Sequence, residues 1–323
     1  MGCRYLKVNI CTPSRLHFGL FDMRGDQGRL YGSAGVAIQR PRLTITAEEA
    51  DETVITGKRS DRAQEIISQI LEKNTIDAGV HLDIKEDIPE HQGFGSGTQF
   101  SIAIGTALNR IFDLGLTYEE IVLGLGRGKR SGIGTHSFQK GGFIVDGGHS
   151  IANPDKIPPL IHRSDVPDDW FFVVCIPEIN TGISGTSETN AFKKLEPPPS
   201  SLIADVSRLV LMGMIPSIVE KDITTFGDTM TKLDTMFGEY WATMQGGVYS
   251  HPRIGECVNK LLSIGAYGAG QSSWGPTLYG LAEGETQAKN LTSEMGEFLN
   301  TGPNKGTVFV TRADNEGAKI NQR

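Results

Sequence analysis

A glycine-rich loop stands between a strand pattern and a helix pattern in the middle of the chain. Residues 80–90, VHLDIKEDIPE, alternate apolar and polar side chains as a strand does, and residues 98–112 carry apolar side chains at helical spacing. Three glycines, a serine and a threonine fall between them, within residues 93–98. Glycines allow successive backbone N–H groups to turn inward, and a helix N-terminus adds unpaired donors and a positive dipole end.

This loop therefore has two interpretations. It is either a tight strand-to-helix turn with a polar cap, or a binding site for phosphate. The second interpretation assigns phosphate contacts to Gly93, Gly95, Ser96, Gly97 and Thr98. No Lys follows the last glycine, so the loop does not match the P-loop pattern GxxxxGK[ST].

The order of the strand and helix patterns limits the fold class. Strand patterns at the N-terminus are followed by a helix pattern at 61–74, and the patterns do not alternate strictly after that. This order favours an α+β fold over a doubly wound parallel sheet. A polar, proline-containing segment at 153–169 precedes a new buried strand pattern, so we predict two domains, 1–165 and 166–323.

Charge and hydropathy exclude several classes of protein. The formal net charge of −7 argues against a general nucleic-acid binder. The longest plain apolar run, residues 170–176, is far too short to cross a membrane. Four cysteines occur without a CxxC pair, and the N-terminal residues lack the apolar core of a signal peptide, so a reducing cytoplasmic location is expected.

A cationic segment follows the glycine loop. Between Glu120 and Asp146 there is no acidic residue, while Arg127, Lys129 and Arg130 stand among glycines. Such cations can bind a phosphate or stabilise the charge that develops on a departing diphosphate. The alternative is a solvated basic turn. Near the N-terminus, Arg15 and His17 are two residues apart in a strand pattern and are expected on one face of that strand.

Three segments carry a resemblance to the GHMP small-molecule kinases. They are TPSRLHFGL at 12–20, PEHQGFGSGTQ at 89–99 and GAGQSSWGPTLYGL at 268–281. The resemblance implies an N-terminal domain like ribosomal protein S5 domain 2 and a C-terminal ferredoxin-like domain, with the site between them. It also implies that Ser272, in the third segment, helps to wall the phosphate pocket.

One departure from the kinase pattern changes the functional expectation. Kinases of this superfamily usually carry an S-G-x-D segment whose Asp activates the acceptor hydroxyl. Here the segment is Ser131, Gly132, Ile133 and Gly134, so a glycine stands at the Asp position. An ATP-dependent kinase with relocated carboxylates remains the second hypothesis, and a non-catalytic nucleotide-binding regulator on the same scaffold is the third.

A closer resemblance is to the β-ribofuranosylaminobenzene 5′-phosphate synthase family, a GHMP-fold branch. It is carried by SRLHFGLFDM, YGSAGVAI, EHQGFGSGTQ, IPEINTGISGTSE and the whole segment 126–148. The resemblance implies a reaction of 5-phosphoribosyl 1-diphosphate with 4-hydroxybenzoate or 4-aminobenzoate that releases CO₂ and diphosphate, in tetrahydromethanopterin biosynthesis. It further implies Mg²⁺ dependence, a homodimer and an archaeal or methylotroph source.

These considerations give a set of candidate roles. Arg130 is the expected catalytic cation, and His17 or His136 is suited by type to move a proton. Asp22 and Asp146 are the candidate Mg²⁺ ligands, although Asp146 can equally form a turn. The remaining expected substrate or phosphate contacts are Arg15, Arg127, Lys129, Ser131, Gly132 and Ser272.

Overall fold

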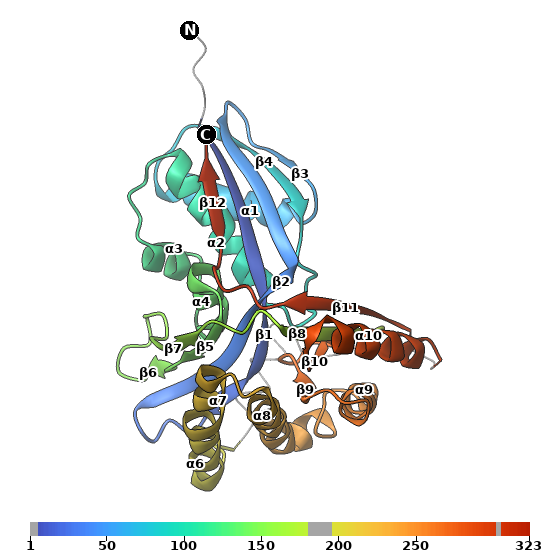
Figure 1. Ribbon diagram of the computed structural model, residues 1–323. Coiled ribbons are helices and arrows are strands. Elements are labelled where there is room, and N and C mark those ends of the chain that lie inside the picture. Colours follow the sequence, from blue (N-terminus) through green and yellow to red (C-terminus); the bar gives the residue numbers. More distant parts are fainter. Residues whose placement is uncertain (1–5, 180–195, 302–304) are drawn as a thin grey trace.

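The computed structural model describes residues 6–179, 196–301 and 305–323 of the chain. Its strands form two mainly antiparallel sheets, each covered by helices. In Figure 1 the sheet that contains β8 to β11 lies below β3, β4 and β12 of the other sheet. The predicted α+β class is confirmed.

The first sheet is built on a long bent pair of strands. These are β1 (Lys7–Asp22) and β2 (Arg29–Ala50), which run antiparallel with register shifts between Thr12 and Ser14 and between His17 and Gly19. The sheet order is β12-β1-β2-β4-β3, and β5 and β6 also pair with β2. The other strands are β3 (Val54–Thr56), β4 (Gly79–Glu86), β5 (Phe143–Asp146), β6 (His149–Ser150), β7 (Leu160–Ser164) and β12 (Lys319–Gln322).

Four helices accompany the first sheet. They are α1 (Ser60–Lys73), α2 (Ser96–Ile111), α3 (Tyr118–Gly124) and α4 (Ile133–Lys140). α1 and α2 match the helix patterns expected at 61–74 and 98–112; α1 buries one apolar face, whereas α2 is buried on all sides from Gln99 to Leu108. The pattern did not predict α4, whose sequence IGTHSFQK is short and mixed; the tertiary structure buries its Ile133 and Phe138.

The second sheet has the order β11-β8-β10-β9. Its strands are β8 (Trp170–Pro177), β9 (Gly268–Gln271), β10 (Leu278–Glu283) and β11 (Gly306–Arg312). With α9 (Pro252–Ser263) before β9 and α10 (Gly284–Asn300) before β11, the βαββαβ order is that of a ferredoxin-like domain. The predicted ferredoxin-like architecture is therefore confirmed.

Both faces of the second sheet are buried, which explains the unbroken apolar run of β8. Phe171, Val173 and Cys175 pack with α9 and α10, while Trp170 and Phe172 face the main core with the first sheet. Successive side chains of a strand point to opposite faces, so a strand covered on both sides is apolar throughout.

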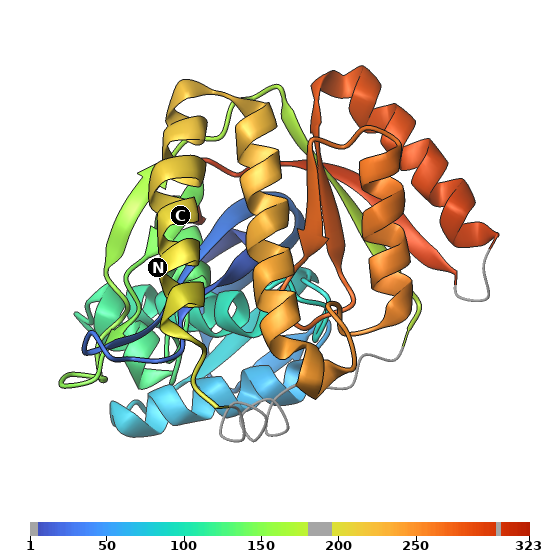
Figure 2. The ribbon, with the colours of Figure 1, turned by 90° about the horizontal axis from the view of Figure 1, so that it is seen from below.

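Helix α8 (Ile223–Gln245) lies between the second sheet and the helical segment α6–η1–α7. Figure 2 shows α8 between this segment and β9, with α9 and α10 beyond the sheet. The segment consists of α6 (Ser200–Leu209), the π-helical turn η1 (Val210–Met214) and α7 (Ile215–Glu220). Within the described ranges, Ser200–Glu220 is the single stretch with the length and apolar composition of a membrane span, and one such helix is weak evidence for a span.

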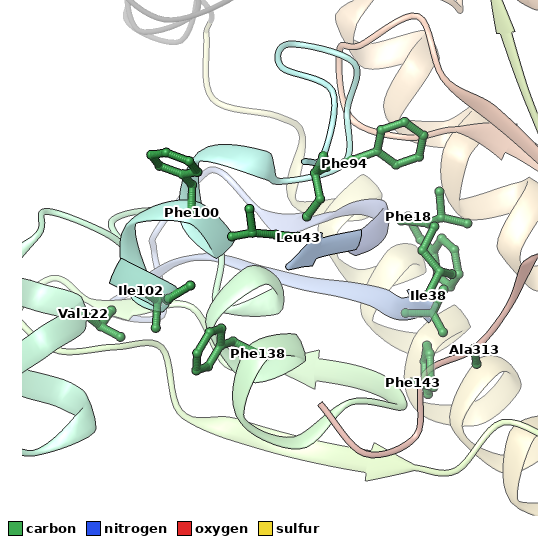
Figure 3. Packing of buried hydrophobic residues seen from close by; sticks show 14 of the residues in the cluster. Phe18, Ile38, Leu43, Phe94, Phe100, Ile102, Val122, Phe138, Phe143 and Ala313 are labelled. Atoms are coloured by element: carbon green, nitrogen blue, oxygen red, sulfur yellow. The ribbon is translucent and has the colours of Figure 1, made fainter. Parts of the chain in front are cut away.

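The main core joins the two sheets. Figure 3 shows part of it: Phe18, Ile38, Phe143 and Ala313 lie on one side of the view, and side chains of α2 and α4 lie on the other. Phe18 and Phe143 stack at 6.4 Å between ring centroids, and Phe226 of α8 meets Phe143 edge-on at 5.3 Å. The expected boundary at 165/166 falls between β7 and β8, but the last strand, β12, returns to pair with β1 in the first sheet (Figure 1).

Candidate active site

Three segments far apart in the sequence meet around the glycine loop. The backbone N–H of Arg15 donates to the Phe94 carbonyl (3.1 Å), and the hydroxyl of Ser272 donates to the Gly93 carbonyl (2.7 Å). The backbone N–H of His17 in turn donates to the Ser272 hydroxyl (3.0 Å). The loop, strand β1 and the β9–β10 turn are therefore one hydrogen-bonded unit.

Two glycines permit the backbones of this unit to touch. Gly93 has φ +90°, and a Cβ there would lie 2.4 Å from the Ser272 carbonyl oxygen. A Cβ on Gly275 would lie 2.4 Å from the Gln92 carbonyl carbon. Because real Cβ atoms do not approach backbone so closely, only glycine fits at either position.

Helix α2 begins directly after the glycine loop, and two arginine side chains lie beside its N-terminus. Gly95 precedes the helix in a left-handed conformation, and no acidic side chain occupies the first turn. The Arg15 side chain lies beside Gly95, and the Arg127 guanidinium lies beside Gly97. Arg127 donates from Nε and Nη2 to the Ser101 hydroxyl at 3.1 and 2.9 Å. Burial, then the charges of Arg62 and Arg59, lower the pKa of Arg127.

A cavity of about 490 Å³ adjoins the helix N-terminus. Among the described residues, its charged lining consists of four cationic side chains and one carboxyl: Arg15, Arg127, Lys129, Arg130 and Asp234. The predicted residues His17, Gly95, Thr98 and Ser131 line it as well. Arg15 and His17 thus share a face, as expected. The cavity is wide enough for a small organic diphosphate, and its charge suits an anion.

A chain of hydrogen bonds leads from the cavity-lining residues His17 and Ser131 into the protein. His17 Nε2 lies 3.2 Å from the Ser131 hydroxyl, which lies 2.7 Å from the Ser33 hydroxyl. Ser33 donates to Asp146, whose carboxylate also accepts from the backbone N–H groups of Gly132 (2.9 Å) and Gly148 (2.8 Å). Burial raises the pKa of Asp146, and these hydrogen bonds oppose the rise. Asp146 therefore anchors the segment that carries Ser131.

Burial, with the Arg15 charge second, lowers the pKa of His17 to about 3. In unfolded protein the imidazole titrates near 6.5, so between pH 3 and 6.5 the unfolded chain binds one more proton than the folded chain. Stability from the neutral His17 is therefore complete above pH 6.5 and falls as the pH drops.

We expect wild type and His17→Gln to differ in how strongly their free energy of unfolding depends on pH. From pH 7 to pH 5 the free energy of unfolding should fall by about 2 kcal/mol more in wild type than in the variant. Urea titrations at the two pH values measure it. Equal losses in both proteins would mean that His17 is not held neutral in the folded state.

Other predicted residues lie outside the cavity lining. His136 is buried, and its Nε2 lies 2.8 Å from the Pro158 carbonyl; burial, foremost, lowers its pKa. Asp22 accepts from the backbone N–H groups of Arg24 (2.7 Å) and Gly25 (2.9 Å) in its own turn. Gly93 and Ser272 hold the loop, Gly97 and Ser96 lie in the first turn of α2, and Gly132 binds Asp146.

The resembling segment 176–188 is described only as far as residue 179. Its remaining positions lie outside the described residues. In the described parts of the chain, no group of three or more His, Cys, Asp or Glu side chains has the geometry to hold a metal ion.

One wall of the cavity was not predicted from the sequence; α8 and the residues after it form this wall. Asp234, Phe237, Gly238 and Trp241 line the cavity at helical spacing, followed by Tyr249. A signal was present: Asp234 belongs to the same helical face as Phe237 and Trp241, and a carboxyl on an apolar face is unusual.

Comparison with known proteins agrees with this architecture. Residues 61–139 match the model of the GHMP kinases N terminal domain, and residues 214–301 match that of GHMP kinases C terminal. A solved homoserine kinase from Cytophaga hutchinsonii superposes with a TM-score of 0.66 at 13% identity, covering 99% of each chain. At that identity the likeness shows the fold alone.

Two curated relatives resemble the whole chain more closely. Both are named beta-ribofuranosylphenol 5′-phosphate synthase. The protein from Methanothermobacter thermautotrophicus is 34% identical, covering 97% of this chain and 98% of the relative. The protein from Archaeoglobus fulgidus is 32% identical over 97% and 99%. The chain therefore belongs to the β-ribofuranosylphenol 5′-phosphate synthase family, a family of pentosyltransferase enzymes built on the GHMP kinase fold.

Proposed function

We propose that this enzyme transfers the 5-phosphoribosyl group of 5-phosphoribosyl 1-diphosphate to the ring carbon of 4-hydroxybenzoate or 4-aminobenzoate that bears the carboxylate. The products are a β-ribofuranosyl arene 5′-phosphate, CO₂ and diphosphate. The relatives' name states the phenol product for those proteins, and the chemistry of the cavity supports the same class of reaction here.

The observation that carries the proposal is the distribution of charge around the mouth of α2. Arg15, Arg127, Lys129 and Arg130 all line the cavity, and the first turn of α2 carries no acidic side chain. Four cationic side chains gathered beside a helix N-terminus suit a ligand that carries negative charge.

This arrangement can stabilise a leaving diphosphate. As the bond from ribose C1 to diphosphate breaks, charge grows on the departing oxygens, and fixed N–H donors and guanidinium groups lower the energy of that state. Arg127 and the α2 N-terminus fit this role, while Lys129 and Arg130 can neutralise either the diphosphate or the 5′-phosphate. Because His17 is neutral, it can orient a substrate oxygen without adding charge.

The two carboxylates expected to bind Mg²⁺, Asp146 and Asp22, do not face this cavity. Asp146 is engaged by Ser33, Gly132 and Gly148 inside the first domain, and Asp22 accepts from its own turn. Neither is part of the cavity lining. The proposed chemistry therefore rests on cations and backbone donors, and the expected Mg²⁺ dependence stays a prediction.

The kinase alternative is disfavoured at Gly134. This residue lines the cavity at the Asp position of the kinase segment, and a Cβ there would come within 3.2 Å of Thr98 Cγ2. An Asp at this position would crowd the side chain that faces the phosphate site. In a non-catalytic regulator, the cationic segment of Arg127, Lys129 and Arg130 would have no evident purpose.

One assay separates the three functions. The protein is incubated with Mg²⁺, 5-phosphoribosyl 1-diphosphate and carboxyl-labelled 4-hydroxybenzoate or 4-aminobenzoate, and released CO₂ is counted. A parallel reaction with ATP and homoserine or mevalonate, acceptors of the kinase superfamily, follows ADP. We expect CO₂ and no ADP; ADP without CO₂ would establish a kinase, and neither product would favour a regulator. A homodimer, a cytoplasmic location and a place in tetrahydromethanopterin biosynthesis remain predictions.

A further inference from the structure

Besides the cations, the cavity lining contains a group of aromatic side chains. Phe237 and Trp241 from α8, Tyr249 after it and Trp274 from the β9–β10 turn line this part. The Trp241 and Trp274 rings meet edge-on at 4.8 Å between centroids. Flat apolar surfaces of this kind suit a benzene ring, so an aromatic acceptor fits here and the charged donor fits at the α2 end.

Asp234 is the one carboxyl among the described lining residues, and it lies within this aromatic wall. Its Oδ1 accepts from the backbone N–H of Gln271 (3.1 Å). Its Oδ2 is buried and makes no hydrogen bond of ordinary geometry with the described residues, and the Tyr249 side chain is its neighbouring donor. A carboxyl that lines a cavity beside aromatic side chains is placed to contact a polar group on an aromatic ligand.

A glycine in β9 leaves room for the Asp234 carboxyl. A Cβ on Gly270 would lie 2.9 Å from both Asp234 Cγ and the Tyr279 hydroxyl oxygen, so the glycine leaves the space that the two groups occupy. Burial raises the pKa of Asp234 to about 8, against smaller effects of the Gln271 N–H and the Tyr249 side chain. Tyr249 and Tyr279 are the titratable groups that face it from the segment after α8 and from β10.

We propose that Asp234 binds the para hydroxyl of a hydroxybenzoate acceptor and removes its proton as the ring attacks the ribose. The inference rests on the proposed function and assigns its acid–base residue. It differs from the expectation for the two histidines: His17 has a pKa of about 3 and is a weak base, and His136 is outside the cavity lining.

The step balances without any further reactant. The phenol O–H bond breaks, the proton passes to Asp234, and the electron pair moves into the ring. The ring carbon bearing the carboxylate bonds to ribose C1, and the C1–O bond breaks with its electrons leaving on the diphosphate. The bond to the carboxylate then breaks, CO₂ departs, the electron pair restores the aromatic ring, and the phenolate oxygen recovers the proton from Asp234.

An arylamine acceptor provides the discriminating comparison. The lone pair of a neutral 4-amino group can enter the ring without loss of a proton, so Asp234 contributes only a hydrogen bond there. A phenol needs the base. The identity of the para substituent should therefore decide how much the reaction depends on Asp234.

The test compares Asp234→Asn with wild type and with Asp228→Asn, using CO₂ release from both benzoates at pH 7. An Asn amide oxygen still accepts from the Gln271 N–H, and Asp228 is exposed on the same helix and paired with Lys232. We expect D234N to lose about 10²–10⁴-fold with 4-hydroxybenzoate and about tenfold or less with 4-aminobenzoate. D228N should match wild type.

A pH profile of wild type supplies a second measurement that does not depend on the variant folding. With 4-hydroxybenzoate, kcat/KM should rise through an apparent pKa near 8 as Asp234 ionises; with 4-aminobenzoate it should stay flat over that range. D234N should regain activity toward the phenol as the pH approaches 10, where free phenols ionise.

The outcomes distinguish the two levels of the argument. A wild type that releases no CO₂ from either benzoate overturns the proposed function and this inference with it. An active wild type whose D234N loses equally with both acceptors, or loses nothing, overturns the role of Asp234 alone. So does an enzyme that accepts only the amine, or identical pH profiles for the two acceptors.

Discussion

Replacing Arg127 with Met should reduce kcat/KM for 5-phosphoribosyl 1-diphosphate by about 10²–10³-fold, the usual effect of removing one donor to developing charge. The guanidinium lies at the mouth of α2 beside Gly97, held by the Ser101 hydroxyl, and within the described residues it forms no ion pair. A diphosphate would supply its counterion. Met retains much of the apolar stem, so the substitution removes mainly charge and donors.

The same change should leave the free protein as stable as wild type or slightly more stable. Arg62 and Arg59 both act on Arg127 as like charges, and burial disfavours its charged form. Removing it relieves both effects in the absence of substrate. Steady-state kinetics and thermal unfolding of one preparation test the pair of expectations together.

Arg62→Met is the matched control for Arg127. Arg62 is exposed and pairs with Glu65 at 2.6 Å on α1, so its loss should change stability by less than about 0.5 kcal/mol and leave kcat/KM near wild type. If R127M lost stability but kept its kcat/KM for 5-phosphoribosyl 1-diphosphate, Arg127 would be a structural residue and would not bind the diphosphate.

Replacing Gly93 with Ala should lower the free energy of unfolding by about 2–6 kcal/mol, the sum of backbone strain and overpacking. The residue has φ +90°, and the new Cβ would lie 2.4 Å from the Ser272 carbonyl oxygen. The Gly93 carbonyl also accepts from Arg15 and Ser272, so a shift of this backbone separates the three segments that form the site. Urea or thermal unfolding measures the effect.

Gly97→Ala controls for glycine loss in the same loop. Gly97 lies in the first turn of α2 without a left-handed φ, and its Cβ would be 3.4 Å from the Arg127 guanidinium, an ordinary contact. Alanine in a helix is favoured over glycine by roughly 0.5–1 kcal/mol, so G97A should be as stable as wild type or more so. Unfolding of G93A at the wild-type midpoint would show that the backbone contact does not hold the site together.

The sequence by itself determined the family and the local elements with a clear periodicity. Strict alternation at 80–86 and helical spacing at 61–74 specify β4 and α1, because burial of one face requires those periods. The unbroken run of β8 indicates a strand buried on both sides, and the three separated motifs identified the fold that the two domain matches share. The glycine loop was correctly placed between a strand and a helix.

Only the tertiary structure decided which residues face the substrate. His17 and His136 are both histidines near cations in sequence, but one lines the cavity and the other binds the Pro158 carbonyl. Asp146 is the last residue of β5, where a metal ligand is plausible from sequence, yet its carboxylate accepts hydrogen bonds from the backbone of Gly132 and Gly148 inside the protein. Asp234 lies more than 100 residues from the glycine loop, and it enters the cavity because α8 packs along β9 beside the end of β1. Such convergence depends on contacts between segments distant along the chain, which the periodicity of any one segment does not contain.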